Sequence, residues 1–372
     1  MPTIRYIMIG GFLGAGKTTA VARLAQALRA KNLRVGLITN DQGSNMVDTA
    51  MLRSRGFPTE EIPGGCFCCR FNSLVDAANK LTESIAPDVF IAEPVGSCTD
   101  LIATVSYPLR RMYGEQFSVA PLSVLIDPIR ALRILKVEEG GNFSEKVRYI
   151  YLKQMEEADL IVINKVETLT LERLGGLRKA IGLKFPAKEI LAVSARTGLG
   201  LPEWFEKLKV GSAPAGEAMP INYDTYADGE ALLGWLNCTV RISGETAWDG
   251  NQVLRRLAEA IHRRLRAAEG EIAHLKMTLS PIGGLGGIGV VNLVRNDYVP
   301  ELSLELAANI LSGELIINAR VEMPPEQILE AVSAGLAEIS GHHHALKFLI
   351  QHEEHFRPGK PQPTHRLKTL KT

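Results

Sequence analysis

Residues Gly11 to Thr18 restrict the fold of this chain more than any other feature, because they fit the pattern G-x-x-x-x-G-K-[ST] at every position. The octapeptide lies between an apolar run that ends at Ile9 and an amphipathic stretch over Lys17–Lys31. A strand before the motif and a helix after it are the context that a phosphate-binding loop requires. A glycine-rich turn without function is the alternative, and this context disfavours it. We therefore expect a nucleotide-binding domain.

Each residue type in the loop has a physical role in holding phosphate. Small residues let backbone N–H groups converge on phosphate oxygens, and the start of the helix adds partial positive charge. Lys17 is expected to reach the outer phosphates and to act in catalysis, while the Thr18 hydroxyl binds Mg²⁺. The expected nucleotide contacts in the loop are those of Gly11, Gly14, Ala15, Gly16, Lys17, Thr18 and Thr19.

Short apolar runs alternate with amphipathic stretches from Ile4 to about Leu208. Each run is too short for a helix and is followed closely by Gly, Asp, Asn, Glu or Ser. Runs that are apolar on both faces, separated by helices, predict an α/β fold with a mostly parallel sheet and helices on both faces. Functional residues should then follow the carboxyl ends of the strands. The runs are residues 6–9, 35–38, 89–92, 122–126, 160–163 and 190–193.

The chain of 372 residues exceeds the usual single domain, so we expect two domains. Residues 1–210 form the nucleotide-binding domain, and residues 211–230, rich in Gly, Ala, Pro and Asp, form a linker. Residues 231–340 predict a small α+β domain. Its strands are expected at 232–242, 273–279, 288–294 and 315–322, and its helices at 251–268 and 325–339.

The last segment, residues 341–372, predicts an extended tail rich in His and Pro. A cluster of histidines lies at His342, His343, His344, His352 and His355. On a helix, His352 and His355 would share a face. A segment that loads metal and a solvated tail that docks on the sheet or on a partner are both open interpretations.

Charge and hydropathy exclude several classes of partner. The formal net charge is +1, so no broad electrostatic field attracts nucleic acid or an anionic membrane. No apolar run approaches the ~20 residues that span a bilayer. The N-terminus runs directly into a strand and lacks the features of a signal peptide. We expect a soluble, cytoplasmic protein.

Two later strand ends carry residues suited to a nucleotide base. A carboxylate at Glu167 can accept both N–H groups on the Watson–Crick edge of guanine, whereas adenine would leave it unpaired at a cost of about 1–3 kcal/mol. Asn164 can meet the base N7, and the Ala195 backbone can donate to O6. We therefore favour GTP over ATP. The full set is Asn164, Lys165, Glu167, Ser194 and Ala195.

Carboxylates after two other strands are candidates for the Mg²⁺ and hydrolysis sites. Glu93, with Gly96 three residues later, can hold a Mg²⁺ water or orient the attacking water, and the Gly96 N–H can sense the γ-phosphate. Asp41 and Asp48 lie where a first switch segment should run, and either can polarise water or contact Mg²⁺. A helix N-cap is an equal alternative for Asp48.

Three of the five cysteines are clustered at Cys66, Cys68 and Cys69. We interpret them as reduced, because a secreted disulfide scaffold would be small and would space its cysteines out. In an extended segment the first two would point to one face and the third to the other. Three thiolates can bind Zn²⁺ or Co²⁺ and leave a fourth position for Cys98 or a histidine. Buried apolar cysteines and a redox-labile pair are alternatives, and Cys238 is expected in the core.

These motifs together resemble the CobW-like P-loop GTPases, a SIMIBI-type group related to the nickel-inserting chaperone GTPases of hydrogenase and urease maturation. Two departures are Glu167 in place of the usual Asp, and Pro94-Val95 in place of a threonine pair. The resemblance covers about residues 1–340 and rests on residues 10–19, Cys66-x-Cys68-Cys69, Glu93-x-x-Gly96 and Asn164-Lys165-x-Glu167.

The resemblance implies slow GTP hydrolysis with Mg²⁺, coupled to handling of Zn²⁺ or Co²⁺ for a client metalloenzyme or a corrinoid protein. Lys17, Thr18, Glu93 and Asn164 would serve the nucleotide and Mg²⁺, and the three thiolates would carry the transported metal. A non-enzymatic metal store, an adaptor for a corrinoid methyltransferase and a small-molecule kinase are the rival readings. No nucleic acid or membrane is expected as a partner, and a homodimer is among the open oligomeric states.

Overall fold

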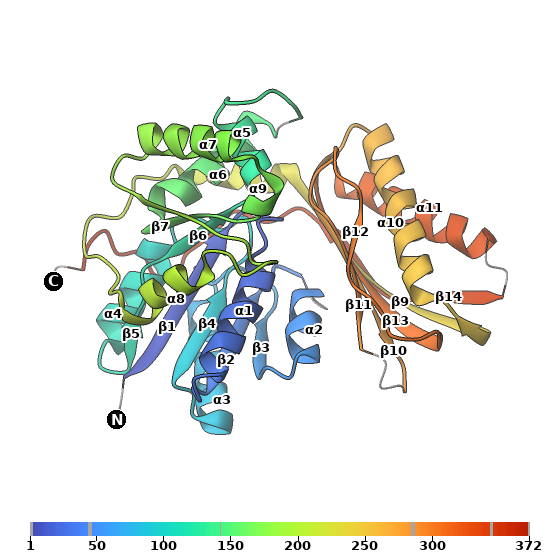
Figure 1. Cartoon of the computed structure of the whole chain (residues 1–372), viewed down its shortest axis with the longest axis horizontal. Helices are drawn as coiled ribbons and strands as arrows, with labels where there is room; N and C mark the ends of the chain where they lie inside the picture. Colours follow the sequence, from blue (N-terminus) through green and yellow to red (C-terminus); the bar gives the residue numbers. More distant parts are fainter. Residues whose placement is uncertain (1–2, 44–46, 142, 284–286, 343–344, 371–372) are drawn as a thin grey trace. The chain divides into compact units, whose positions relative to one another are not determined.

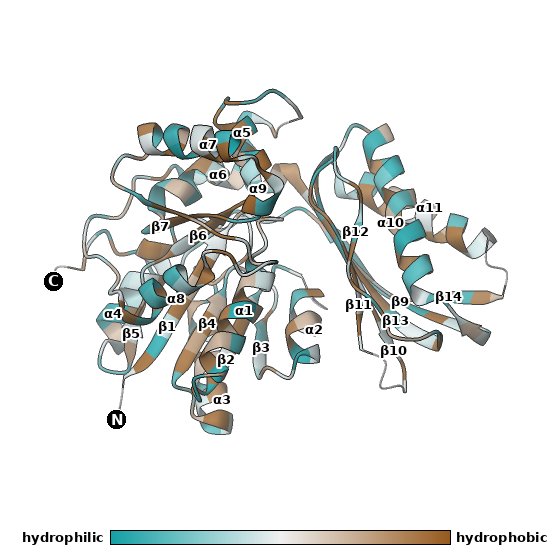
Figure 2. Ribbon diagram, viewed as in Figure 1, coloured by the Kyte–Doolittle hydropathy of each residue, from teal (hydrophilic) through white to brown (hydrophobic). Residues whose placement is uncertain are grey.

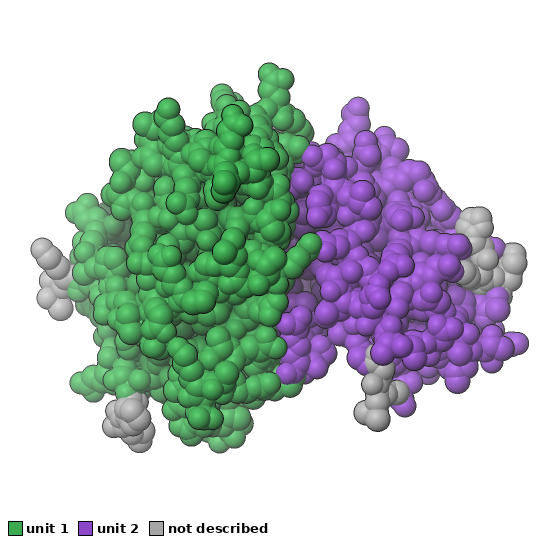
Figure 3. Space-filling view, viewed as in Figure 1, with its two compact units in different colours: residues 1–42, 56–229, 360–372 green, residues 43–55, 230–359 purple. Residues whose placement is uncertain are grey.

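The computed structural model describes residues 3–43, 47–141, 143–283, 287–342 and 345–370. The chain forms two compact units (Figure 3). Unit 1 comprises residues 1–42, 56–229 and 360–372, and unit 2 comprises residues 43–55 and 230–359. The division differs from the expected one at two places, because residues 43–55 belong with the second unit and residues 360–372 return to the first.

Unit 1 is built on a parallel sheet with the strand order β3-β2-β4-β1-β6-β7-β8, and β5 also pairs with β1 (Figure 1). All residues of β2, β4, β6 and β7 are buried, so elements cover both faces of the sheet. This confirms the predicted α/β class. The strands are β1 (Ile4–Gly11), β2 (Val35–Asn40), β3 (Thr59–Ile62), β4 (Val89–Glu93), β5 (Phe117–Val119), β6 (Ser123–Ile126), β7 (Leu160–Ile163) and β8 (Glu189–Ala192).

The helices of unit 1 alternate with these strands along the chain. They are α1 (Lys17–Arg29), α3 (Phe71–Ile85), the π-helix η1 (Ile102–Ser106), α4 (Tyr107–Tyr113), α5 (Pro128–Ile134), α6 (Glu145–Glu157), the 3-10 helix η2 (Val166–Thr168), α7 (Leu171–Lys184) and α8 (Leu201–Val210). Among the described residues, no helix combines the length and the apolar character that crossing a membrane requires.

The segment expected to be a linker is packed rather than free. Its second half forms α9 (Tyr223–Leu232), and the Tyr226 side chain is fully buried. The Tyr226 hydroxyl accepts a hydrogen bond from the Thr99 N–H at 3.3 Å. Tyr223 and Tyr226 supply the apolar surface of this segment, although its surrounding composition is typical of a loop.

Unit 2 is an antiparallel sheet with the strand order β12-β11-β10-β13-β9-β14 (Figure 1). Its helices are α2 (Val47–Ser54), α10 (Gly250–Ala267) and α11 (Pro325–His342). Hydrophilic and hydrophobic residues alternate along α10 (Figure 2), and its buried residues join the core of the sheet. The strands are β9 (Leu233–Trp248), β10 (Glu271–Pro281), β11 (Gly289–Leu293), β12 (Glu301–Leu304), β13 (Ile310–Glu322) and β14 (Leu346–Phe356).

Strand β14 lies within the segment expected to be an extended tail. It pairs antiparallel with β9 from Leu346 to Phe356. The sequence of this stretch contains enough large apolar residues for an edge strand, which the histidines obscured. His352 and His355 are therefore on a strand, three residues apart, and do not share a face. His343 and His344 lie outside the described residues, as does the side chain of His342.

Candidate nucleotide and metal sites

The phosphate loop connects β1 to α1 and takes its shape from its glycines. Gly11, Gly14 and Gly16 have φ angles of 127°, 78° and 89°, which side chains disfavour. A Cβ on Gly11 would lie 2.2 Å from the Leu125 carbonyl oxygen. A Cβ on Gly16 would lie 2.5 Å from Asn164 Nδ2. The loop therefore requires glycine at both ends, as a backbone cradle for phosphate does.

Lys17 and Thr18 begin α1, and both are buried. Lys17 Nζ donates to the Gly11 carbonyl oxygen at 2.9 Å, so the ammonium group lies against the loop itself. Thr18 Oγ1 donates to Glu93 Oε1 at 3.0 Å. The hydroxyl expected to bind Mg²⁺ and the carboxylate expected to hold its water thus meet. Oxygen ligands of these two kinds suit Mg²⁺.

The residues expected around the base are brought to the same edge of the sheet. Asn164 Nδ2 donates to the Ala15 carbonyl oxygen, and Asn164 Oδ1 accepts from the Ala195 N–H, both at 2.9 Å. The Ala195 N–H, expected to contact a base oxygen, is thus bonded to Asn164 in this structure. The Ser194 hydroxyl accepts from the Thr197 N–H at 2.9 Å and shapes the turn.

Lys165 is held in the left-handed conformation with a φ of 57°. Its Nζ donates to the Gly14 carbonyl oxygen at 2.7 Å and pairs with Asp127 Oδ2 at 2.9 Å. Glu167 follows on η2 and is exposed. The Glu167 carboxylate is therefore exposed to solvent, two residues after Lys165, whose side chain is fixed by its two contacts.

Asp41 and Asp48, the two carboxylates of the expected first switch segment, fall in different units. Asp41 follows β2 in unit 1, and its Oδ1 accepts from the Gln42 N–H at 2.7 Å. Asp48 is in the first turn of α2 in unit 2, where it pairs with Lys276 Nζ at 2.6 Å. The ion pair gives Asp48 a structural role within unit 2.

The segment from Glu93 to Cys98 passes from the phosphate loop to the cysteines. A Cβ on Gly96 would lie 3.1 Å from the Leu13 backbone nitrogen, so Gly96 packs directly on the phosphate loop. The buried Gln154 of α6 donates through Nε2 to the Gly96 carbonyl oxygen at 3.0 Å and to the Cys98 carbonyl oxygen at 2.8 Å. The Gln154 side chain therefore holds the backbone at both Gly96 and Cys98.

The three clustered cysteines bring their sulfur atoms together. Cys66 Sγ lies 2.7 Å from Cys68 Sγ and 3.3 Å from Cys69 Sγ, and Cys68 Sγ lies 3.7 Å from Cys69 Sγ. The Cys98 side chain is in hydrogen-bond contact with those of Cys66 and Cys68. Three sulfurs therefore form one cluster, and a fourth cysteine from another segment of unit 1 contacts two of them.

A tight turn gathers these sulfurs, and the expectation of an extended segment is wrong. The N–H groups of Cys69 and Arg70 both donate to the Cys66 carbonyl oxygen, at 3.0 Å and 2.9 Å. Gly65, with a φ of 147°, allows the chain to enter the turn. Asn40 Nδ2 holds the Gly65 carbonyl oxygen at 2.6 Å. All three thiols consequently face one another.

The donor set fits a thiophilic ion. Hydrogen bonds from Cys68 and Cys69 hold the pKa of the Cys66 thiol well below its ordinary value, and the contact with Cys66 raises the pKa of Cys69 to about 11. Tetrahedral Zn–S bonds of about 2.3 Å would place sulfurs about 3.8 Å apart. The cluster therefore needs only a small expansion to surround such an ion.

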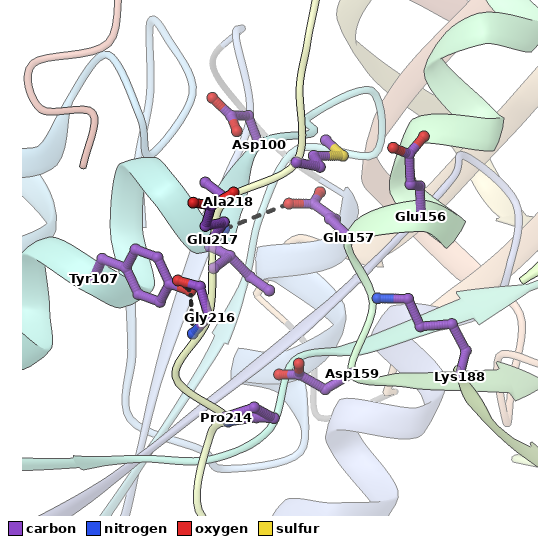
Figure 4. Close-up of a pocket in the computed structure, with 12 residues that line it drawn as sticks. Asp100, Tyr107, Glu156, Glu157, Asp159, Lys188, Pro214, Gly216, Glu217 and Ala218 are labelled. Carbon is purple, nitrogen blue, oxygen red and sulfur yellow. Dashed lines mark hydrogen bonds between the residues drawn. The ribbon is translucent and has the colours of Figure 1, made fainter. Parts of the chain in front are cut away.

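An acidic pocket with a volume of about 200 Å³ lies in unit 1, between the end of α6 and residues 214–219 (Figure 4). Glu157 lines it and is buried, with its carboxylate accepting from Thr99 Oγ1 at 3.1 Å and from the Ile102 N–H at 3.4 Å. Burial raises the pKa of Glu157 to about 8. Its protonation therefore changes near neutral pH.

The fold and the phosphate loop together define a P-loop nucleotide-binding domain of the α/β class. Residues 5–189 match the sequence profile of the CobW/HypB/UreG nucleotide-binding domain, so this part of the chain is a domain of that kind. This confirms the resemblance inferred from the motifs.

Named relatives share this part of the chain. The zinc chaperone YeiR of Escherichia coli is 30% identical over 175 residues, which are 46% of this chain and 49% of YeiR. The zinc chaperone CobW of a Sinorhizobium species is 30% identical over 213 residues, 51% of this chain and 58% of that protein. The chain thus spans about half the length of these relatives.

A solved structure of HypB from Helicobacter pylori with nickel is also similar to part of the chain. It aligns with a TM-score of 0.42 at 19% identity, over 57% of this chain and 91% of HypB.

The sequence motifs do not predict several residues of these sites. Asp127 directly follows β6, so the rule that polar residues follow strand ends would have found it. Gln154 and Asn40 act through contacts with distant backbone atoms, for which the sequence carries no local signal.

Proposed function

We propose that this chain is a cytoplasmic GTPase that carries Zn²⁺ or Co²⁺ on Cys66, Cys68 and Cys69 and passes the ion to a client metalloprotein or corrinoid protein. The observation that carries the proposal is the cluster of three sulfur atoms, all within 4.8 Å of one another, in the unit that holds the phosphate loop. Two relatives named as zinc chaperones support zinc as the cargo. The cytoplasm keeps such thiols reduced.

The nucleotide half of the function rests on the contacts around α1. Lys17 would exchange its bond to the Gly11 carbonyl oxygen for phosphate oxygens. Thr18 would hold Mg²⁺, with Glu93 beside it, and the ion would neutralise charge on the outer phosphates. Glu93 and Asp41 are the carboxylates that would orient the attacking water. Phosphoryl transfer needs mainly such positioning and charge stabilisation.

The base site supports GTP as the nucleotide. Asn164 joins the phosphate loop to the Ala195 turn, so a base bound beyond it would contact both. Glu167 is exposed and free to turn toward the Watson–Crick edge of guanine. Lys165, fixed on Gly14 and Asp127, would cover one side of the nucleotide.

Coupling between nucleotide and metal would run through the Glu93–Cys98 segment. Glu93 contacts Thr18, Gly96 packs on the phosphate loop, and Cys98 contacts two of the thiols. A γ-phosphate that shifts Gly96 would also shift Cys98, because Gln154 bonds to both of their carbonyl oxygens. We propose Cys98 as the fourth metal ligand, available in one nucleotide state and withdrawn in the other.

A metal titration in the two nucleotide states tests this function. Zn²⁺ affinity would be measured by competition with a chromophoric chelator, once with a non-hydrolysable GTP analogue and Mg²⁺ and once with GDP and Mg²⁺. We expect affinities that differ at least tenfold. The difference should vanish in the Cys98→Ala variant, and equal affinities in the parent protein would refute the coupling.

A further inference from the structure

The C-terminal residues 360–368, which we call the strap, lie on the thiol site. The chain leaves β14 of unit 2 at Phe356, and residues 360–372 belong to unit 1. The strap has no helix or strand, and its two prolines, Pro361 and Pro363, favour an extended backbone. It is therefore a stiff, extended segment.

Three hydrogen bonds join the strap to the cysteine turn. The Gln362 N–H donates to Cys69 Sγ at 3.1 Å. The Thr364 N–H donates to the Cys68 carbonyl oxygen at 2.8 Å, and Thr364 Oγ1 donates to the Cys69 carbonyl oxygen at 3.1 Å. Cys66 and Cys68 are buried, whereas Cys69 is only partly buried. The strap thus crosses the cluster at the sulfur that solvent can reach.

Strap residues that follow Thr364 in the sequence make further contacts with unit 1. Arg366 Nε donates to Asp100 Oδ2 at 2.7 Å, and only 1% of the Asp100 side chain is exposed. The same carboxylate oxygen accepts from the Tyr223 hydroxyl at 2.6 Å. The Leu367 N–H then donates to the Ala103 carbonyl oxygen at 2.9 Å. Breaking the ion pair would leave a buried carboxylate without its cation, which is costly.

One ring contact adds to this attachment. His365 packs edge-to-face on Phe71 at a centroid distance of 5.1 Å, and Phe71 is fully buried at the start of α3. The strap therefore contacts unit 1 at the thiol turn, through Gln362 and Thr364, and at each of the next three residues, 365–367.

We propose that the strap is the gate of the thiol site, and that it must lift from Cys68 and Cys69 before an ion passes to or from another protein. This rests on the proposed function, because it assigns the strap to the cargo site of that function. The Gln362 N–H bond strengthens when Cys69 is a metal-bound thiolate, since an ionised acceptor makes the stronger bond. Closure of the strap is consequently tighter on the loaded site, and the loaded ion exchanges slowly.

Two pairs of full-length variants test the gate. Gln362→Pro removes the N–H that bonds to Cys69 together with the glutamine side chain, between two prolines that already favour an extended conformation. Gln362→Ala removes the side chain alone and keeps that N–H. Arg366→Gln removes the cation that pairs with Asp100, and Lys368→Gln makes the same change of charge at an exposed position of the strap.

The measurements are the rate of Zn²⁺ release to excess chelator and the rate of Cys69 alkylation in metal-free protein. We expect Arg366→Gln to raise both rates about tenfold and Gln362→Pro to raise them about threefold, as lost bonds of these two kinds imply. Both controls should match the parent. Since Arg366→Gln leaves Asp100 buried and can destabilise the fold, the Gln362 pair decides in that case.

Parent-like rates in both Arg366→Gln and Gln362→Pro would overturn the gate. If Zn²⁺ also bound equally in the GTP-analogue and GDP states, the nucleotide coupling of the proposed function would fail as well. Nucleotide-dependent binding with unchanged release rates would remove the gate alone.

Discussion

The phosphate loop and the thiol turn both follow strands of unit 1, yet they are built differently. The phosphate loop is continuous in sequence, and its own glycines at positive φ set its shape. The thiol turn supplies three sulfurs from four consecutive residues. Its remaining contacts come from Asn40, from Cys98 and from the strap.

This difference indicates different tasks. A self-contained cradle binds the same phosphates whatever the rest of the chain does, because its N–H groups are held by local geometry. A site assembled from several segments changes its affinity when any one of them moves. The self-contained cradle suits recognition of a fixed ligand. The site assembled from several segments suits an ion that must be taken up and released.

Removing one thiol should have the largest effect and should separate the two sites. We expect Cys66→Ser to weaken Zn²⁺ binding by a hundredfold or more, because Cys66 contacts each of the other sulfurs and second-shell changes alone cost about 10–100-fold. Nucleotide affinity should stay within twofold. Zn²⁺ competition and fluorescent-nucleotide titration would measure both.

The matched control is Cys238→Ala, which removes a buried thiol from the core of unit 2. Its Zn²⁺ affinity should equal that of the parent. Loss of Zn²⁺ binding in this control, or retention of it in Cys66→Ser, would contradict the assignment of the cargo site.

A substitution in the phosphate loop should have the opposite pattern, with weaker nucleotide binding and unchanged Zn²⁺ binding. Lys17→Ala should weaken triphosphate binding tenfold or more, because charge-assisted hydrogen bonds contribute about 1.5–3 kcal/mol each. Zn²⁺ affinity in the absence of nucleotide should not change. Lys31→Ala, at an exposed ion pair with Glu206, is the control. A nucleotide dissociation constant within threefold of the parent would defeat the assignment of Lys17.

The same contrast explains how much of the molecule the sequence predicts. Alternating apolar runs and one contiguous motif were enough for the parallel sheet and the phosphate loop, because both depend on local pattern. The sulfur cluster was predicted as a set of ligands, but its turn was not. The hydrogen bonds that shape it join Cys66 to Arg70 and Gly65 to the distant Asn40.

The features that the sequence does not predict are those in which the chain returns to an earlier element. Residues 43–55 join unit 2, the strap joins unit 1, and β14 pairs with β9 across about a hundred residues of sequence. Such pairings depend on tertiary context, which overrides weak local propensity. Composition rich in Pro and His was typical of a tail, and only the contacts show that the segment is ordered.

A third prediction concerns the buried Glu157, whose carboxylate accepts a hydrogen bond from Thr99, the residue after Cys98. The pKa of Glu157 is about 8 in the folded protein and 4.5 in its ordinary state, with burial as the main cause. The folded state therefore holds this proton more tightly than the unfolded chain does. The stability it contributes is fully present below about pH 4.5 and is lost as the pH rises through 8.

We expect Glu157→Gln to remove this dependence. The loss of stability between pH 6 and pH 8 should be smaller in the variant by on the order of 2 kcal/mol. Chemical denaturation at both pH values would measure it. Glu156→Gln, at a half-buried neighbour that pairs with Lys153, is the control and should keep the dependence of the parent. Identical slopes in the parent protein and Glu157→Gln would show that Glu157 is ionised throughout.

The smallest expected effect is on the choice of base, where the phosphate loop has no influence. Glu167 follows Lys165 on η2 and is exposed, so its longer side chain can reach a base edge only at some loss of rotamer freedom. Glu167→Asp shortens that side chain, and we expect the ratio of ATP to GTP dissociation constants to rise about threefold. Glu172→Asp, at the start of α7, is the control. An unchanged ratio would mean that Asn164 and the Ala195 turn read the base without the carboxylate, whereas a fall would mean that the glutamate length is already the better fit.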